Sequence, residues 1–269
     1  MRPNTLAEKL RGGQMVLGLG LMYPAPSIIE SMCKGWDFAW IDTQHGQFSY
    51  DTTLHGCQVA AACGIDSIVR VTGHEASTLG RFADINPSAI MVPMVNSADE
   101  ARAIIRALRF PPLGMRSYGG RRVIDVDGRE FYRERELVSV LQIETKEGLA
   151  AAEAIAAVET VDVLFFGPDD MKIQMGLPVN ASITDTPEIR AAMDAVAKAA
   201  RKAGKFAGCV AATGPAIRMA ADMGYTLVVG GGDVSFLRTA APAKLEELKQ
   251  ALGLGAAPAA GKQGKPGVY

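Results

Sequence analysis

Acidic, basic and amide side chains stand at the ends of several short apolar runs in this sequence. The run FAWI leads into Asp42-Thr43-Gln44-His45, and the run SIV ends at Arg70. Further along, VSVL leads into Gln142-Ile143-Glu144, and DVLFF leads into Gly167-Pro168-Asp169-Asp170. If these runs are strands of one parallel barrel, their polar ends meet on one face, where such groups can bind a cation and move protons.

Glu144 and Asp170 are candidate ligands for a hard divalent cation. Mg²⁺ and Mn²⁺ favour oxygen ligands in octahedral geometry, which water and substrate oxygens usually complete. Two carboxylates from neighbouring strand ends can therefore share one ion. The residues alone leave a second interpretation open, because each carboxylate can also cap the following helix or pair with an arginine, and the helix dipole favours an acid at the position of Asp170.

His45 follows Asp42 by three residues, and a nearby carboxylate raises the basicity of an imidazole and fixes its tautomer. This spacing predicts a proton-transfer dyad, although a loop histidine without a task fits it too. Arg70 suits bidentate binding of a carboxylate or a developing oxyanion, and its structural alternative is an ion pair with Asp42 or Glu144. The turn Gly167–Asp170 opens a helix whose free N–H groups can receive a substrate carboxylate.

Eight apolar, β-rich runs alternate with helical patterns along the chain, which predicts parallel strands joined by crossover helices. Several runs are apolar almost throughout, as in strands covered on both faces, so we predict an α/β fold with a closed TIM (β/α)8 barrel. The predicted strands are Met15–Gly20, Phe38–Asp42, Asp66–Val71, Ala89–Val95, Val138–Glu144, Val161–Phe166, Phe206–Val210 and Thr226–Gly230.

The 269 residues are enough for one such domain, which we place at residues 1–252 and expect to end in a C-terminal helix. Residues 253–269 are rich in Ala, Gly and Pro, and we interpret them as an extended tail. Helices are predicted over Ser97–Leu108, Glu147–Val158 and Thr186–Ala203, and the arginine-rich stretch Arg109–Asp127 is predicted to be a long functional loop.

Composition limits the classes of function. A net charge of −1 without a Lys/Arg-rich face argues against a nucleic-acid partner. No secretory signal or membrane-spanning run stands out, and the four scattered cysteines fit reduced, buried side chains, so we expect a cytoplasmic protein. Gly230-Gly231-Gly232 lacks the pattern of a nucleotide-binding loop, and we expect no nucleotide cofactor.

Taken together, these motifs give the chain a clear family resemblance. It resembles the HpcH/HpaI family of class II pyruvate aldolases, and is similar to its 4-hydroxy-2-oxoheptanedioate and 2-dehydro-3-deoxyglucarate aldolases, which serve aromatic or sugar acid catabolism. The resemblance runs from about Gly12 to Tyr269, and the segments that carry it are GWDFAWIDTQH, VPMVNSADEARAIIRALRFPPLGMRS, LQIETKEGL, VDVLFFGPDDM and KPGVY.

The resemblance implies a TIM-barrel aldehyde-lyase that uses Mg²⁺, Mn²⁺ or Co²⁺. Such an enzyme reversibly cleaves a 4-hydroxy-2-oxo acid into pyruvate and an aldehyde through a metal-stabilised enolate. By position, Glu144 and Asp170 match the metal ligands of the family, and His45 with Asp42 matches its proton-transfer dyad. No Schiff-base lysine is required, and we interpret Lys172 as a surface or pocket-rim charge.

Further matches concern the substrate and the assembly. Arg70 matches the arginine at the keto oxygen, Gln142 a glutamine on the substrate side, and the amides of Asp169 and Asp170 the carboxylate-binding turn. Asp84 matches an acidic residue near the subunit boundary. The family implies a homohexamer built from dimers that exchange a helix, with the C-terminal helix and tail in the contacts.

Three departures from the family pattern concern specificity. Gln44 replaces a glutamate, Asp169 replaces an alanine, and Gly18 or Leu19 stands where a tryptophan is common. Two alternatives therefore stay open: an acyl-CoA lyase of the citrate-lyase-β or malyl-CoA type, and a catalytically inactive binding barrel. The first needs basic groups for coenzyme A, for which the sequence offers Arg116, Arg121 and Arg122.

Overall fold

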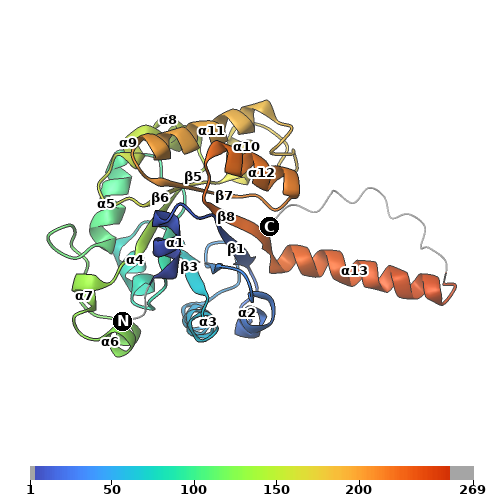
Figure 1. Cartoon of the computed structure of the whole chain (residues 1–269), viewed down its shortest axis with the longest axis horizontal. Helices are drawn as coiled ribbons and strands as arrows, with labels where there is room; N and C mark the ends of the chain where they lie inside the picture. Colours follow the sequence, from blue (N-terminus) through green and yellow to red (C-terminus); the bar gives the residue numbers. More distant parts are fainter. Residues whose placement is uncertain (1–3, 255–269) are drawn as a thin grey trace.

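The computed structural model describes residues 4–254 of the chain. Most of the predicted tail, 253–269, and the KPGVY motif lie outside the described residues. The strands form a closed barrel in which every neighbouring pair is parallel, and β8 closes it against β1 (Figure 1). The predicted TIM barrel is therefore confirmed.

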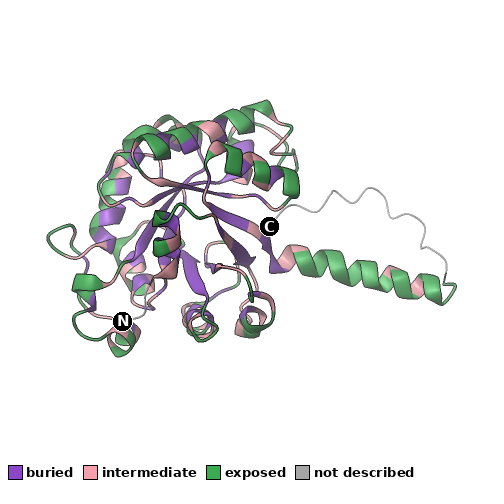
Figure 2. Cartoon of the chain, viewed as in Figure 1, coloured by how far each residue is buried: buried purple, intermediate pink, exposed green. Residues whose placement is uncertain are grey.

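All eight predicted strands are present, with ends shifted by at most a few residues. They are β1 Val16–Leu21, β2 Phe38–Asp42, β3 Asp66–Arg70, β4 Ala89–Val92, β5 Val138–Ile143, β6 Val163–Phe166, β7 Phe206–Val210 and β8 Leu227–Gly232. Nearly every strand residue is buried, because one face packs inside the barrel and the other against the helices (Figure 2).

Alternate strand residues fill the interior of the barrel. Phe38 and Trp40 of β2, Val140 of β5 and Phe165 of β6 belong to one buried cluster, which Leu6 and other residues of the N-terminal helix also join. Successive side chains of a strand point to opposite faces, so every second residue points into the barrel. The next inward-pointing residue after this cluster lies at the carboxyl end of each strand. In β2 and β5 those positions hold the polar residues Asp42 and Gln142, and after β6 the position holds Gly167.

The helices surround this barrel. They are α1 Thr5–Arg11, α2 Pro26–Met32, α3 Tyr50–Ala62, α4 Ala76–Ala83, α5 Ala98–Leu108, α6 Arg121–Asp127, α7 Phe131–Glu134, α8 Lys146–Ala150, α9 Ala152–Ala156, α10 Pro168–Gln174, α11 Pro187–Lys202, α12 Gly214–Met223 and α13 Asp233–Ala251. None of the described helices combines the length and apolarity needed to cross a membrane.

The predicted helices differ from the observed ones in detail. Ser97 caps α5, with its hydroxyl oxygen accepting from the Glu100 amide at 3.1 Å. The Glu100 carboxylate accepts from the Asn96 amide and not from the Ser97 amide, so the pair does not form a reciprocal capping box. The stretch predicted as one helix over 147–158 is two short helices, α8 and α9, that meet at Ala151.

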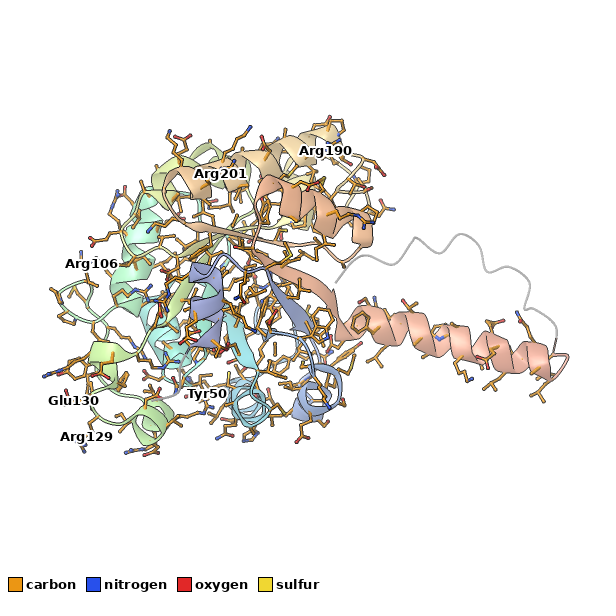
Figure 3. The ribbon with its side chains drawn as sticks, in the orientation of Figure 1. Tyr50, Arg106, Arg129, Glu130, Arg190 and Arg201 are labelled. Atoms are coloured by element: carbon orange, nitrogen blue, oxygen red, sulfur yellow. The ribbon has the colours of Figure 1, made fainter. Side chains whose placement is uncertain are left out.

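The connection between α5 and β5 is more ordered than a plain loop, since α6 and α7 lie within it. Arg129 and Glu130, labelled in Figure 3, lie between these helices at the outer edge of the molecule. Arg116 packs over the rings of Phe110 and Phe131, at 4.9 and 6.0 Å from the ring centroids. This segment therefore forms a small aromatic cluster of its own.

Helix α13 projects away from the barrel (Figure 1). Asp233, its first residue, is buried and accepts hydrogen bonds from the amides of Met22 and Tyr23. Beyond this anchor nearly the whole helix is exposed (Figure 2). The expected C-terminal helix is thus present, and it packs on the barrel only through its beginning.

Candidate active site

A cavity of about 320 Å³ lies at the carboxyl ends of the strands. It brings together most of the predicted site residues, which come from the ends of β3 and β5 and from the turn between β6 and α10. They are Arg70, Gln142, Glu144, Asp169 and Asp170. Active sites of TIM barrels lie on this face. The cavity is therefore the candidate active site.

Glu144 follows β5 and is held by two hydrogen bonds. Its Oε1 accepts from the Met94 amide at 2.8 Å, and its Oε2 accepts from Gln142 Nε2 at 2.8 Å. The Met94 backbone adopts a left-handed conformation with φ of 56°, which few non-glycine residues adopt. The carboxylate is thus fixed between the end of β4 and the end of β5.

Burial has a strong effect on this carboxylate. Glu144 is 2% exposed, and its burial raises its pKa from 4.5 to about 7, with the negative charge of Asp170 adding to the rise. The Met94 amide and the positive charge of Arg70 act in the opposite direction on this pKa. A positive charge placed beside this carboxyl group would stabilise its ionised form and lower its pKa.

Gly167 has no side chain where the Glu144 side chain needs room. A Cβ on Gly167 would lie 2.4 Å from Glu144 Oε2 and 2.7 Å from Glu144 Cβ. The next residue, Pro168, begins α10, so Asp169 and Asp170 lie in the first helical turn. Amides in the first turn of a helix have no partner within the helix. The carboxylate-binding role of this turn stays a prediction.

Arg70 is 2% exposed and points along the barrel interior at the end of β3. Its Nε and Nη2 donate to Oδ1 and Oδ2 of Asp42 at 2.9 and 2.5 Å, a bidentate pair. Its guanidinium also lies over Trp40, 4.7 Å from the ring centroid. The ion pair with Asp42 named among the alternatives is therefore present, and it fixes Arg70 at the wall of the cavity.

His45 lies apart from these groups. It is exposed, on the loop after β2, and it is not among the residues that line the cavity. The Asp42 carboxylate accepts from the backbone amides of Gln44 and His45 at 3.0 and 3.3 Å. In residues 4–254, the hydrogen bonds of this carboxylate go to Arg70 and these amides, not to the imidazole of His45.

Asp84 also lies outside the cavity. It ends α4, and its carboxylate accepts from Arg116 Nη2 at 2.7 Å. Gly120 packs against it closely, since a Cβ there would lie 2.8 Å from Asp84 Cβ. Within the described chain, Asp84 thus connects α4 to the segment that contains α6.

Lys172 differs from its prediction. It is 4% exposed and lines the cavity, so of the two predicted positions the surface is wrong, and the pocket is where the residue lies. Its Nζ donates to Asp169 Oδ1 and to the Val179 carbonyl oxygen, both at 2.9 Å. These contacts occupy two of the three hydrogens of its ammonium group.

The residues present fit a divalent cation. The described residues hold no cluster of three or more His, Cys, Asp or Glu side chains suited to a metal. Glu144 and Asp170 nevertheless give carboxylate oxygens to one cavity, where Gln142 Oε1 is buried without a hydrogen-bond partner. An all-oxygen donor set that leaves positions for water and substrate suits Mg²⁺ or Mn²⁺ better than a soft metal.

Three residues of the cavity wall were missed or misplaced by the sequence. Trp40 lies two residues before Asp42 on the same strand, so a period of two would have placed both inside the barrel. Gly167 and the buried Lys172 give no such signal. Their roles depend on contacts with Glu144 and Val179, which come from other parts of the fold.

Comparison with known proteins adds independent information. A family model described as HpcH/HpaI aldolase/citrate lyase matches residues 24–240. A hydroxypyruvate/pyruvate aldolase of Delftia acidovorans is 32% identical over 248 residues, which covers 90% of this chain and 91% of the relative. A 4-hydroxy-2-oxovalerate aldolase of Novosphingobium aromaticivorans is 36% identical, over 65% of this chain and 68% of its own.

Solved structures agree with the fold. An HpcH/HpaI aldolase/citrate lyase family protein from Burkholderia cenocepacia superposes with a TM-score of 0.84 at 28% identity, covering 92% of this chain and 100% of that one. The two structures therefore share the whole barrel and not only a part of it.

Proposed function

Because the chain belongs to the HpcH/HpaI aldolase/citrate lyase family, we propose that it is a divalent-metal-dependent aldolase. It reversibly cleaves a 4-hydroxy-2-oxo acid into pyruvate and an aldehyde. The observation that carries the proposal is the grouping of Glu144, Asp170 and the unpartnered Gln142 Oε1 in one cavity beside the buried Arg70. The aldolase relatives support the same class of reaction.

A metal held by Glu144 and Asp170 would supply Lewis-acid stabilisation of the negative charge that develops on the substrate oxygens. Arg70 adds a fixed positive charge at the same place. Its Nε and Nη2 are engaged by Asp42, which leaves Nη1 to donate to the keto oxygen of the 2-oxo acid. The first-turn amides of Asp169 and Asp170 receive the substrate carboxylate.

His45 is the proposed proton acceptor on the basis of its family match. Because its imidazole lies outside the cavity, the step requires the loop after β2 to bring it to the substrate. Its imidazole takes the proton of the 4-hydroxyl group, the C3–C4 bond breaks, and the electron pair of that bond passes into the pyruvate enolate while C4 becomes the aldehyde carbon. Asp42 positions the His45 loop through its bond to the backbone amide. In this proposal the Asp42 carboxylate has two tasks. It orients His45 by accepting from the backbone amide of that residue, and it orients Arg70 by accepting from the guanidinium.

The acyl-CoA alternative is weakened by the arginines on which it depended. Arg116 pairs with Asp84, Arg121 pairs with Asp125, and Arg122 donates to the carbonyl oxygens of Cys57 and Asn86. Arg116 and Arg122 are engaged in this way, and of the three only Arg121 has a largely exposed side chain, so together they do not form one binding surface for the phosphates of coenzyme A. We therefore prefer the aldolase.

The test uses the purified full chain with pyruvate in D₂O. With Mn²⁺ or Mg²⁺ we expect NMR to show exchange of the methyl protons, and EDTA to abolish it until metal is restored. A screen of aldehydes read by product mass then tests bond formation. Exchange that persists in chelator would contradict metal dependence, and no exchange under any condition would favour the inactive barrel.

We propose that the chain assembles into a homo-oligomer, a hexamer by its family resemblance, and that α13 takes part in the contacts. Leu237, Leu245 and Leu248 are 48%, 52% and 49% exposed on this projecting helix. Large apolar side chains gathered on one element mark a surface that another protein covers. Mass in solution tests the assembly directly.

A further inference from the structure

The cavity is lined by two cationic side chains, Arg70 and Lys172, within the described chain. Each lies against a carboxylate of its own. Arg70 pairs with Asp42 at 2.5 Å, and Lys172 pairs with Asp169 at 2.9 Å. Both cations are almost fully buried, so these pairs face little competition from water. No cation of the described cavity lining is left unpaired to bind a second acid group of a substrate.

Lys172 connects two parts of the cavity wall. Its Nζ reaches Asp169 in the first turn of α10 and the Val179 carbonyl oxygen in the segment between α10 and α11. Burying an ammonium group away from water costs free energy unless its hydrogens find acceptors in the protein. These two acceptors satisfy that need and fix the segment at Val179.

The wall that Lys172 fixes is uncharged. Residues 179–184 all line the cavity, with Val179 and Ile183 apolar and Asn180, Ser182 and Thr184 neutral and polar. The end of β7 and the start of α12 add other apolar side chains to the lining, namely Val210, Ala212 and Ala216. This part of the cavity lies beside the carboxylates of Glu144 and Asp170 and offers hydroxyl and amide groups but no net charge.

We propose that the Lys172–Asp169 ion pair determines which aldehyde the site accepts. We place the aldehyde in the part of the cavity lined by residues 179–184. The pair holds this segment through Val179 and leaves that part without net charge, so the site takes a short uncharged aldehyde and disfavours one that carries a carboxylate. Asp169 and Lys172 are three residues apart in α10, so one helix positions both members of the pair. The inference rests on the proposed aldolase function.

The test compares butanal with 4-oxobutanoate, which have four carbons each and differ by one carboxylate. We measure kcat/KM for both in condensation with pyruvate and Mn²⁺, and expect wild type to prefer butanal. Asp169→Ala frees the ammonium group and should raise the 4-oxobutanoate to butanal ratio by about tenfold or more. Lys172→Met leaves the carboxylate unpaired and should lower that ratio.

The double variant Asp169→Ala with Lys172→Met removes both charges and should return the ratio close to the wild-type value. A role in folding alone would not move the ratio in opposite directions. Lys198→Met is the matched control, because Lys198 pairs with Asp194 on the exposed face of α11 and lies outside the cavity. It should leave the ratio unchanged.

Three results would overturn the inference. One is a wild-type preference for 4-oxobutanoate, and another is a ratio that stays constant in both single variants; in either case the aldolase function itself stands. The third is a wild type that forms no bond with either aldehyde or with any in the wider screen. That outcome removes the proposed function, and the inference with it.

Discussion

Glu144 combines deep burial, a neighbouring acid and two hydrogen bonds in one carboxyl group. Since its pKa rises from 4.5 in water to about 7 in the metal-free fold, the folded state retains a proton that the unfolded chain loses. The metal-free protein therefore loses stability as pH rises from 4.5 to 7, by about 3 kcal/mol from this group. The loss is complete above the folded-state pKa.

Thermal melts in EDTA test this linkage. Between pH 5 and 7.5 the Tm of wild type should fall as Glu144 loses its proton. In Glu144→Gln, which cannot ionise at this position, the fall of Tm should be smaller by that contribution. Mn²⁺ should stabilise wild type most at the upper end of this range, where the carboxylate is free of its proton, and should not stabilise the variant. Glu147→Gln, at an exposed position of α8, serves as control and should keep the wild-type profile.

His45 gives the second prediction at the scale of a residue. His45→Ala should lower kcat for cleavage by a factor of about 10² to 10⁴, because general-base catalysis contributes on that order. Metal affinity should stay near wild type, since Glu144 and Asp170 are intact. His55→Ala, on the exposed side of α3, is the control. A His45→Ala enzyme with full kcat would exclude the imidazole from the mechanism.

The period of two explains which site residues the sequence could identify. Asp42, Arg70 and Gln142 continue the inward face of their strands, and the structure brings Arg70 and Gln142 to the cavity wall with Asp42 behind Arg70. Loop residues do not follow that rule. The place of His45, outside the cavity, and the burial of Lys172 depend on loop paths that residue types alone do not specify.

At the scale of elements, the turn between β6 and α10 is tested through Gly167. In Gly167→Ala the new Cβ would meet Glu144 Oε2 at 2.4 Å and Glu144 Cβ at 2.7 Å. Both contacts are too close, so the Glu144 side chain must move away from Gln142. We expect Mn²⁺ affinity, measured by calorimetry, to fall at least tenfold, because ligand geometry governs binding of such ions.

Gly80→Ala is the control for that change. Gly80 lies inside α4, and nothing stands within 4 Å of a Cβ built there. Alanine should therefore leave metal binding unchanged and stabilise the fold by about 0.5–1 kcal/mol, since glycine is the weaker helix former. Equal Mn²⁺ affinity in Gly167→Ala and wild type would contradict the role given to the β6–α10 turn.

Strands were more predictable than helices in this chain. A strand buried on both faces gives a continuous apolar run, and each of the eight runs proved to be a strand. The Ala-rich stretch 147–158 has high helix propensity throughout, yet Ala151 adopts ψ near 1° and separates α8 from α9. Propensity summed over a window does not report such a local change at one residue.

At the scale of the whole molecule, α13 does not share in the packing that holds the barrel together. Its 19 residues extend about 28 Å, and only Asp233 among them is buried. An apolar stripe runs along it at helical spacing, through Leu237, Ala241, Leu245 and Leu248. Most of the stability of a helix in a protein comes from packing of its apolar face, so burying the stripe against another subunit would stabilise α13.

Replacing Leu245 and Leu248 together by Asp should therefore reduce the mass in solution, measured by sedimentation equilibrium, because two charges would lie in the buried contact. The barrel should stay folded, since these side chains lie beyond the part of α13 anchored by Asp233. Gln250→Asp adds a charge to the same helix outside the stripe and should leave the assembly intact. A wild-type protein that is already monomeric, or a double variant of unchanged mass, would show that α13 does not join the subunits.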